Sequence, residues 1–219
     1  MQQNQWRRFR AGLPNAALHV FVIAITGPVL WSSPIDAEDG LQTEEHFNVQ
    51  APALLSASEA EAIYEGIIDE MIGAYALSQD PSARAYRRWR RFNAAPYQSA
   101  THGSRYVNNY ANPTARSYDR LDQIDHLPVG SVLAKDSFAV TEDGDVFLGP
   151  LFLMEKMEMG FDPAARDWRY SMIMPDGSFF GDTLGPDPDS VGFCITCHQA
   201  AGDERDHLFF VPEDARVED

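Results

Sequence analysis

The two cysteines of the chain lie three positions apart, with a histidine directly after the second. They form the run Cys194-Ile195-Thr196-Cys197-His198. Two thiols at this spacing can bond to the two vinyl groups of one haem, and the adjacent histidine then lies beneath the iron as an axial ligand. The run therefore predicts one covalent haem c, held by Cys194 and Cys197, with His198 as the proximal iron ligand.

Two other uses of the same residues stay open. A redox disulfide between the cysteines would not need His198 beside it. A tetrahedral zinc site needs four ligands, and the sequence has no second Cys/His pair at ligand spacing. Haem attachment is the interpretation that uses all three residues.

A sixth iron ligand has to come from earlier in the chain, because no methionine follows Cys197. Methionines often fill gaps in hydrophobic cores, and core packing is the favoured interpretation of each candidate. We therefore expect an open or weakly occupied sixth position, where small molecules bind. The candidates are Met154, Met157, Met159, Met172 and Met174.

The composition excludes several classes of protein. The chain has 219 residues, with 17 Lys and Arg against 33 Asp and Glu, and a formal net charge of −16. Nucleic-acid binding is not expected, because phosphate contacts need clustered cations. No long apolar run follows the N-terminal region, which excludes a polytopic membrane protein. The expected partner is a soluble cytochrome or another redox protein.

The N-terminal residues have the order of an export signal. Residues 1–35 contain three arginines and no acid, and an apolar run extends from Ala16 to Trp31 before small and polar residues. A basic, then apolar, then small-residue order is typical of a secretory signal, with an uncleaved anchor as the alternative. We therefore expect a periplasmic protein.

The remaining chain is expected to form three regions. Residues 36–55 are expected to be a flexible leader and residues 56–92 a helical N-terminal region. Ser56-Ala57-Ser58-Glu59 has the form of a capping box at the start of an amphipathic helix. A second, arginine-rich helix is expected over Ser82–Phe92. Residues 93–219 are expected to form the haem-binding β domain.

The β domain is expected to contain an antiparallel sheet, because tight turns join neighbouring strands. A short helix starting at Pro113 and running to about Ile124 and a last helix from about Val191 complete the pattern. The expected fold class is α+β, with an N-terminal amphipathic helix and a C-terminal haem-bearing helix. The expected strands are Arg105–Tyr110, Ser131–Val140, Val146–Glu155, Trp168–Met174 and Ser178–Gly181.

The order of these features resembles the cytochrome P-460 family, which includes the related cytochromes c′-beta. The resemblance covers roughly Trp89 to Ala200, and the haem motif is its most specific part. It is carried by the run Gly130-Ser131-Val132-Leu133-Ala134-Lys135-Asp136, by Gly149, Glu155 and Asp167-Trp168, and by Cys194, Cys197 and His198.

The resemblance implies a mainly antiparallel β fold, usually dimeric, with one haem c and a proximal histidine. Catalytic members of the family oxidise hydroxylamine to nitrous oxide or nitric oxide, and a strand lysine in them is bonded to a haem meso carbon. Lys135 is the residue that matches this lysine. Members without the bond are gas-binding proteins, so a pentacoordinate haem c protein that binds NO or CO is the alternative.

The sequence supplies further candidates for the chemistry above the iron. A lysine in an apolar, alternating strand is costly unless it is used or paired, although an edge lysine that reaches water is common. Arg105 could donate to an iron-bound oxygen or a haem propionate, and Glu155, Asp182, Asp187 or Asp189 could be the base that removes protons. Surface roles are the favoured interpretation of the arginine and the acids. His102 could support the site, but a turn residue is favoured.

Overall fold

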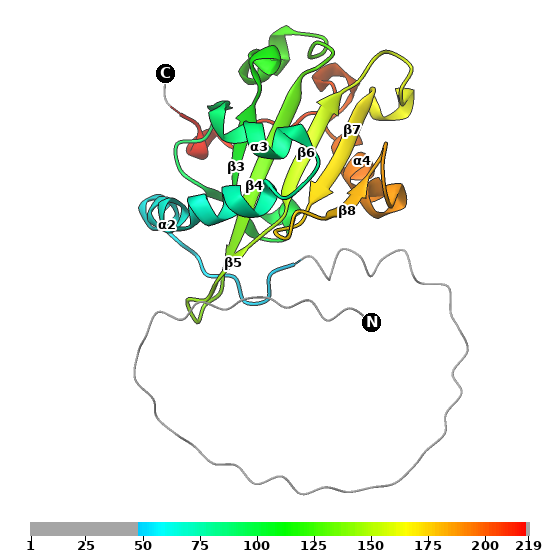
Figure 1. Ribbon diagram of the computed structural model, residues 1–219. Coiled ribbons are helices and arrows are strands. Elements are labelled where there is room, and N and C mark those ends of the chain that lie inside the picture. Colours follow the sequence, from blue (N-terminus) through cyan, green and yellow to red (C-terminus); the bar gives the residue numbers. More distant parts are fainter. Residues whose placement is uncertain (1–47, 218–219) are drawn as a thin grey trace, which may run out of the picture.

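The computed structural model describes residues 48–217, and their fold is the predicted α+β class (Figure 1). Eight strands form one antiparallel sheet in the order β1-β3-β4-β6-β7-β8, with β2 paired to β3 and β5 paired to β4. The strands are β1 Arg90–Arg91, β2 Tyr97–Ser99, β3 Arg105–Ala111, β4 Val132–Val140, β5 Val146–Leu148, β6 Leu151–Lys156, β7 Trp168–Ile173 and β8 Phe179–Asp182.

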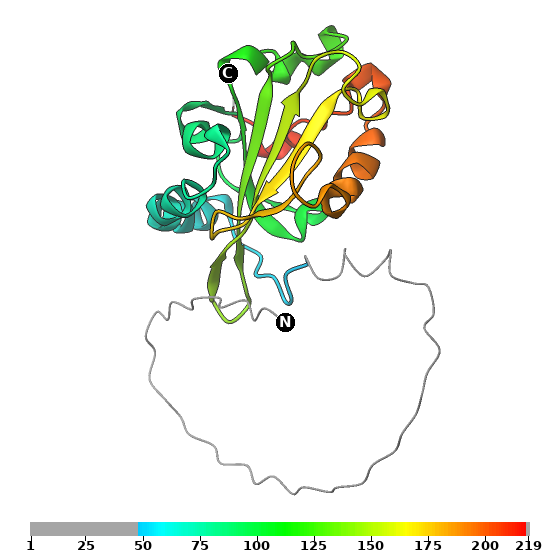
Figure 2. The ribbon, with the colours of Figure 1, turned by 45° about the vertical axis from the view of Figure 1, so that its right-hand side comes forward.

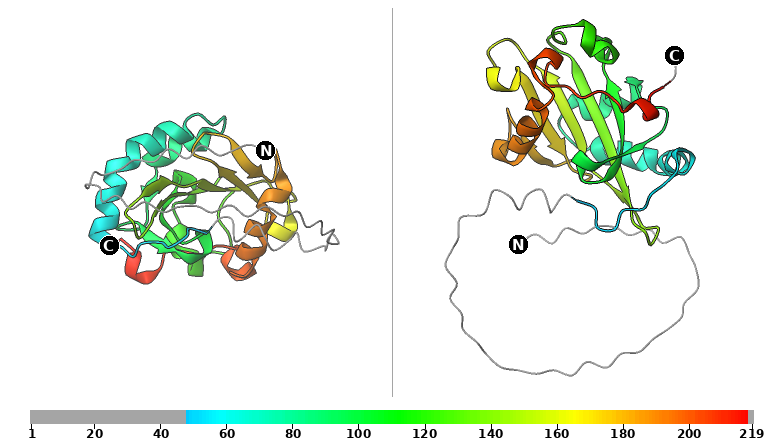
Figure 3. Two further views of the ribbon diagram at one scale, coloured as in Figure 1. Left: turned by 90° about the horizontal axis from the view of Figure 1, so that it is seen from below. Right: turned by 180° about the vertical axis from the view of Figure 1, so that it is seen from behind.

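Helices cover both faces of the sheet (Figures 1 and 2). The α-helices are α2 Ala57–Tyr75, α3 Pro81–Ala85 and α4 Gly192–Gln199. Short 3₁₀-helices lie between the larger elements: η1 Tyr86–Arg88, η2 Ala100–His102, η3 Pro113–Ala115, η4 Tyr118–Gln123, η5 Pro163–Ala165, η6 Pro188–Val191, η7 Asp203–Arg205 and η8 Glu213–Ala215. Seen from below, α2 lies on one side of the sheet and α4 on the other (Figure 3).

Helix α2 begins at the predicted capping box. The Ser56 side chain accepts from the Glu59 N–H, and the Glu59 carboxylate accepts from the Ser56 N–H at 2.8 Å. The buried face of the helix includes Tyr64, Met71 and Tyr75, which recur at helical spacing and pack on the sheet. The helical region and the sheet therefore share one hydrophobic core.

The prediction of one helix over Ser82–Phe92 is wrong. Asp80 caps α3 and Pro81 occupies its first position, but the α-helix ends at Ala85. Arg90 and Arg91 instead pair with Ala111 and Tyr110 as an edge strand. Helical spacing describes only local sequence. It gives no information about the open edge of β3, with which the same residues can pair as a strand.

Two further elements differ from expectation. The helix expected from Pro113 to about Ile124 is the pair of 3₁₀-helices η3 and η4. The strand expected over Val146–Glu155 is divided into β5 and β6 at Gly149-Pro150. A side chain at position 149 would collide with Ser137 Oγ, and Pro150 has no N–H to donate to a ladder.

Much of the N-terminal part lies outside the described residues. The expected export signal at 1–35 and residues 36–47 of the expected leader are among them. Residues 48–55, the end of that leader, bond to the sheet: Ala53 N–H donates to the Val140 carbonyl at 2.8 Å and Leu55 N–H to Tyr106 Oη at 2.7 Å. None of the helices within residues 48–217 is long and apolar enough to cross a membrane.

The strand register places one row of side chains opposite α4. Asn109 pairs with Lys135, Lys135 with Phe152, and Phe152 with Met172, across β3, β4, β6 and β7. Because side chains alternate along a strand, Asp136 points to the opposite face, toward α2. There it accepts from Tyr64 Oη at 2.6 Å and from Asn108 Nδ2 at 2.9 Å.

We predict that Tyr64→Phe destabilises the protein by about 1–3 kcal/mol, because the buried Asp136 carboxyl loses a hydrogen-bond donor. Urea unfolding of the variant and the parent chain measures the difference. Glu65→Gln, an exposed change on the same helix, should stay within about 0.5 kcal/mol. Equal midpoints for Tyr64→Phe and the parent would contradict the role of this bond.

Candidate haem site

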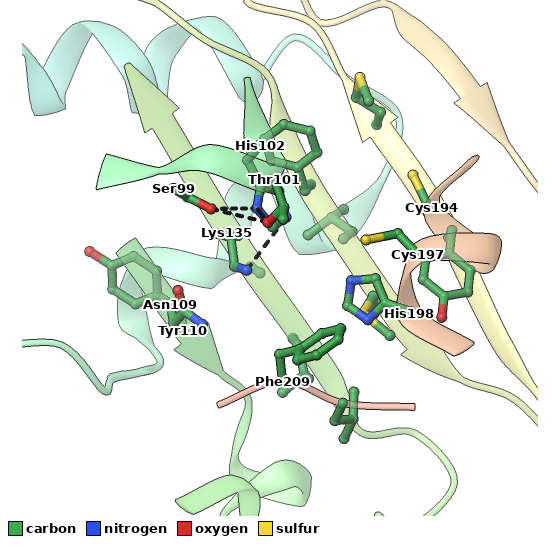
Figure 4. A pocket seen from close by; sticks show the side chains of 18 of the residues that line it. Ser99, Thr101, His102, Asn109, Tyr110, Lys135, Cys194, Cys197, His198 and Phe209 are labelled. Atoms are coloured by element: carbon green, nitrogen blue, oxygen red, sulfur yellow. Dashed lines mark hydrogen bonds between the residues drawn. The ribbon is translucent and has the colours of Figure 1, made fainter. Parts of the chain in front are cut away.

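A cavity of about 350 Å³ lies between the sheet and α4. Its floor is the row of strand side chains, and residues 208–212 of the C-terminal segment close one side. Lys135, Cys197 and His198 point toward one another across it (Figure 4). Most of the lining is apolar, with Phe152, Met172 and Phe209 among the large side chains. A large, mainly apolar cavity with a few polar groups is typical of cofactor sites.

Helix α4 positions both thiols and the histidine. Cys194 and Cys197 are both free, and their spacing in a helix places them on one face, next to His198. Burial, and then the neighbouring Cys197, raises the pKa of the Cys194 thiol to about 12. The preceding η6 packs closely on β8, where a side chain at Gly181 would lie 2.7 Å from the Asp187 carbonyl.

The tautomer of His198 follows from its hydrogen bond. Its Nδ1 lies 2.9 Å from the carbonyl oxygen of His207, and since a carbonyl only accepts, Nδ1 carries the hydrogen. Nε2 therefore keeps its lone pair, which is the form that binds a metal. Burial, and then the nearby Lys135, lowers the pKa of His198 to about 4, so the ring is neutral at pH 7.

A buried ion pair holds the loop that supplies this carbonyl. Lys156 Nζ contacts Asp206 Oδ1 at 2.6 Å, and both side chains are less than a tenth exposed. The Leu127 N–H donates to Asp206 Oδ2 at 3.0 Å, and Trp168 Nε1 donates to the Asp206 carbonyl at 2.9 Å. The backbone of Asp206 and His207 is left-handed, with φ of 54° and 58°. The pair thus fixes an unusual turn beneath His198.

Lys135 extends into the cavity from the centre of β4. Burial lowers the pKa of its amine to about 8. Its Nζ lies 3.4 Å from His102 Nε2. The lysine is half-buried, and its amine forms no ion pair with a carboxylate within residues 48–217.

The chain belongs to the cytochrome P460 family. The family model described as Cytochrome P460 matches residues 83–210, more than half of the chain. A comparison with curated proteins found no match. The matched residues include the sheet, Lys135 and the run from Cys194 to His198, so this cytochrome P460 is a haem protein, and the lone-pair tautomer of His198 fits an iron ligand.

Arg105 is another predicted residue that the fold brings to the cavity. It lines the wall at the start of β3, and its Nη1 donates to the His102 carbonyl at 3.3 Å. Met154, Tyr170 and Met172 also line the cavity. The Tyr170 hydroxyl is buried and has no hydrogen-bond partner among residues 48–217.

The structure does not bring the predicted carboxylates to this cavity. Glu155 and Asp182 both pair with Arg169, and the Arg169–Glu155 contact is 2.9 Å. These three residues lie on the face of the sheet that packs against α2, the face that also carries Leu153 and Ile173. Asp187 and Asp189 are also absent from the lining, as are Met157, Met159 and Met174. Within the described chain, no three His, Cys, Asp or Glu side chains gather as a metal site, so the zinc alternative gains no support.

The sequence interpretation named His102 as a residue that could support the site but favoured a turn role for it. It ends η2 in the loop between β2 and β3, yet its ring packs edge-on against Phe152 at 5.0 Å and lines the cavity. Burial, and then the charge of Lys135, lowers the pKa of His102 well below its usual value. The sequence feature that points to this turn is Gly103, because glycine adopts positive φ readily. In the structure its φ is 72°, at the turn that folds this loop back over the sheet.

We predict that Asp206→Asn destabilises the protein by about 3–5 kcal/mol, because Lys156 is left buried without its partner charge. The double variant Asp206→Asn/Lys156→Met should recover part of the loss. Denaturant unfolding gives the free energies, with the exposed Glu204→Gln as the matched control. If Asp206→Asn costs no more than the control, the pair does not hold the loop.

Proposed function

We propose that this cytochrome P460 is an exported mono-haem c protein that oxidises hydroxylamine, with the haem bonded to Cys194 and Cys197. The observation that carries the proposal is that Lys135 and His198 face one cavity from opposite layers of the fold. When bound, haem supplies an iron that takes hydroxylamine through nitrogen and accepts its electrons.

His198 and α4 supply the proximal side. Nε2 of His198 would bind the iron, while the hydrogen bond from Nδ1 to the His207 carbonyl keeps the ring in one orientation. The thiols of Cys194 and Cys197 form thioether bonds from the same helix. Phe209 packs edge-on against the His198 ring, with 5.7 Å between ring centroids, and Phe152 with other apolar side chains of the lining would limit water in the cavity.

Lys135 forms a bond from Nζ to a haem meso carbon in this proposal. The support is its position in the family pattern and the direction of its amine into the cavity. With a pKa of about 8, roughly a tenth of the amine is neutral at pH 7, and the neutral amine is the nucleophile. Such a bond would distort the macrocycle, which is one means of adjusting haem electronics.

Two expectations about the cell go with this proposal. Residues 1–35 direct export to the periplasm, and a soluble cytochrome or another redox protein accepts the electrons from hydroxylamine. A homodimer is the expected assembly. These follow from the sequence pattern and the family resemblance.

The alternative function is binding of NO or CO by a pentacoordinate haem c without turnover. The favouring observation is the apolar, aromatic lining with Phe152 and Phe209, which suits small uncharged ligands. This alternative requires a Lys135 that is not bonded to the haem.

We predict that Lys135→Ala and Lys135→Arg keep the covalent haem but lose the red-shifted ferrous Soret band and hydroxylamine oxidation. Neither side chain provides a primary amine at this position. The parent chain should show the shifted band, and its yield should rise as maturation pH approaches and passes 8. An ordinary high-spin haem c spectrum in the parent chain, unchanged by either substitution, would overturn the enzyme proposal and favour gas binding.

A further inference from the structure

A polar path leads from the cavity to the surface through His102. On the cavity side, His102 Nε2 lies 3.4 Å from Lys135 Nζ. On the other side, His102 Nδ1 lies 2.8 Å from Ser99 Oγ and 3.3 Å from Thr101 Oγ1. Ser99, Thr101 and His102 all line the cavity together with Lys135, and Thr101 is the one of them that is exposed, so it lies where the cavity meets solvent (Figure 4).

The imidazole is suited to pass a proton along this path, because its two nitrogens face the two ends. With hydrogen on Nδ1, the ring donates to a hydroxyl oxygen and Nε2 accepts from the Lys135 amine. A proton that arrives at Nε2 is matched by one that leaves Nδ1. The edge-on contact with Phe152 at 5.0 Å fixes the ring plane between the two ends.

The charged groups around His102 favour its neutral, accepting form. The charged or titratable side chains that act electrostatically on His102 are Lys135 on β4, Arg105 on β3 and His198 on α4, and none of them is an acid. Neither Glu155 nor Asp182 reaches this side of the sheet. Among residues 48–217, the contacts through His102 therefore form a hydrogen-bonded route from the Lys135 amine to the exposed Thr101 hydroxyl.

We infer that His102, with Thr101 and Ser99, is the proton relay that carries protons from the Lys135 amine to solvent. The inference deepens the proposed function and rests on it, because it names the residues that take the proton from the Lys135 amine before the lysine bond forms. His102 acts here through Lys135 and is a positioning and proton-transfer residue.

The lysine bond can be written so that atoms and electrons balance. One N–H bond of the neutral amine and one meso C–H bond break, and one N–C bond forms. Two electrons and two protons pass to an oxidant of the peroxide class, which is reduced to two waters. Nζ carries an extra proton in the ammonium form, and this proton leaves first, through His102 Nε2 and then Nδ1 to the hydroxyls and water.

We predict that His102→Gln keeps the haem but slows formation of the lysine bond by about 100-fold, the lower end of the effect of a positioned general base. Thr101→Val should slow it less, since Ser99 remains. His126→Gln, the same change at an exposed histidine, is the matched control. The holoprotein with unreacted Lys135 is treated with hydrogen peroxide, and the Soret shift and the loss of two hydrogens in intact mass are followed with time.

A pH series separates a relay from a structural role. In His102→Gln, raising the pH should restore the rate of lysine-bond formation, because hydroxide and bulk water then remove the proton from the amine. If the substitution had only displaced Lys135, the rate would stay low at every pH. Parent-like rates in His102→Gln, or a defect that is independent of pH, would overturn the relay.

Failure of the proposed function gives a different result. If the parent holoprotein never forms the lysine bond, the enzyme proposal fails. The relay is then tested by the rate at which acetic anhydride acetylates the free Lys135 amine, and peptide mass identifies the acetylated lysine. The relay then requires at least about tenfold slower acetylation in His102→Gln than in His126→Gln. Equal rates would overturn it.

Discussion

The hydrogen bond from His198 Nδ1 to the His207 carbonyl is the interaction on which the site depends. It selects the tautomer that leaves Nε2 free for iron, and it does so through a carbonyl that the protein holds in a left-handed turn. The buried Lys156–Asp206 pair secures that turn to the end of β6. A local bond beside the haem motif is thus anchored in the sheet by residues more than forty positions away.

Strand alternation then divides the chemistry between the two faces of β4. Lys135 points into the cavity under α4, and the next residue, Asp136, points into the core under α2. Both side chains are titratable, but Asp136 is fully buried and accepts from two hydrogen-bond donors, whereas Lys135 is half-buried and its amine contacts His102. A well-satisfied carboxyl stabilises one layer, while a weakly held amine remains available for reaction in the other.

Features encoded in one short segment could be predicted from the sequence. The haem motif from Cys194 to His198 and the capping box at Ser56 and Glu59 are of this kind, because all their groups lie within one helical turn. The sheet followed from the alternation of strands and turns. The role suggested for Lys135 needed the family resemblance, since an apolar strand with one lysine is consistent with a surface position too.

Features that depend on register or on distant partners could not be predicted. Glu155 and Asp182 were candidate bases for which surface roles were favoured; the register of β6, β7 and β8 places both on the α2 face, where they pair with Arg169. His102 became a cavity residue only because the β2–β3 hairpin folds its loop over Phe152, a residue fifty positions away in sequence. Arg90 and Arg91 joined the sheet because β3 offered an open edge.

The most direct test of the account is whether haem is bonded to this chain at α4. The exported protein, purified from a host able to mature c-type cytochromes, is boiled in detergent and separated by electrophoresis, with Cys194→Ser/Cys197→Ser as the control. The account predicts red pigment migrating with the parent chain, an intact mass that includes one haem, and no pigment on the control. Pigment that leaves the parent chain on boiling would contradict it.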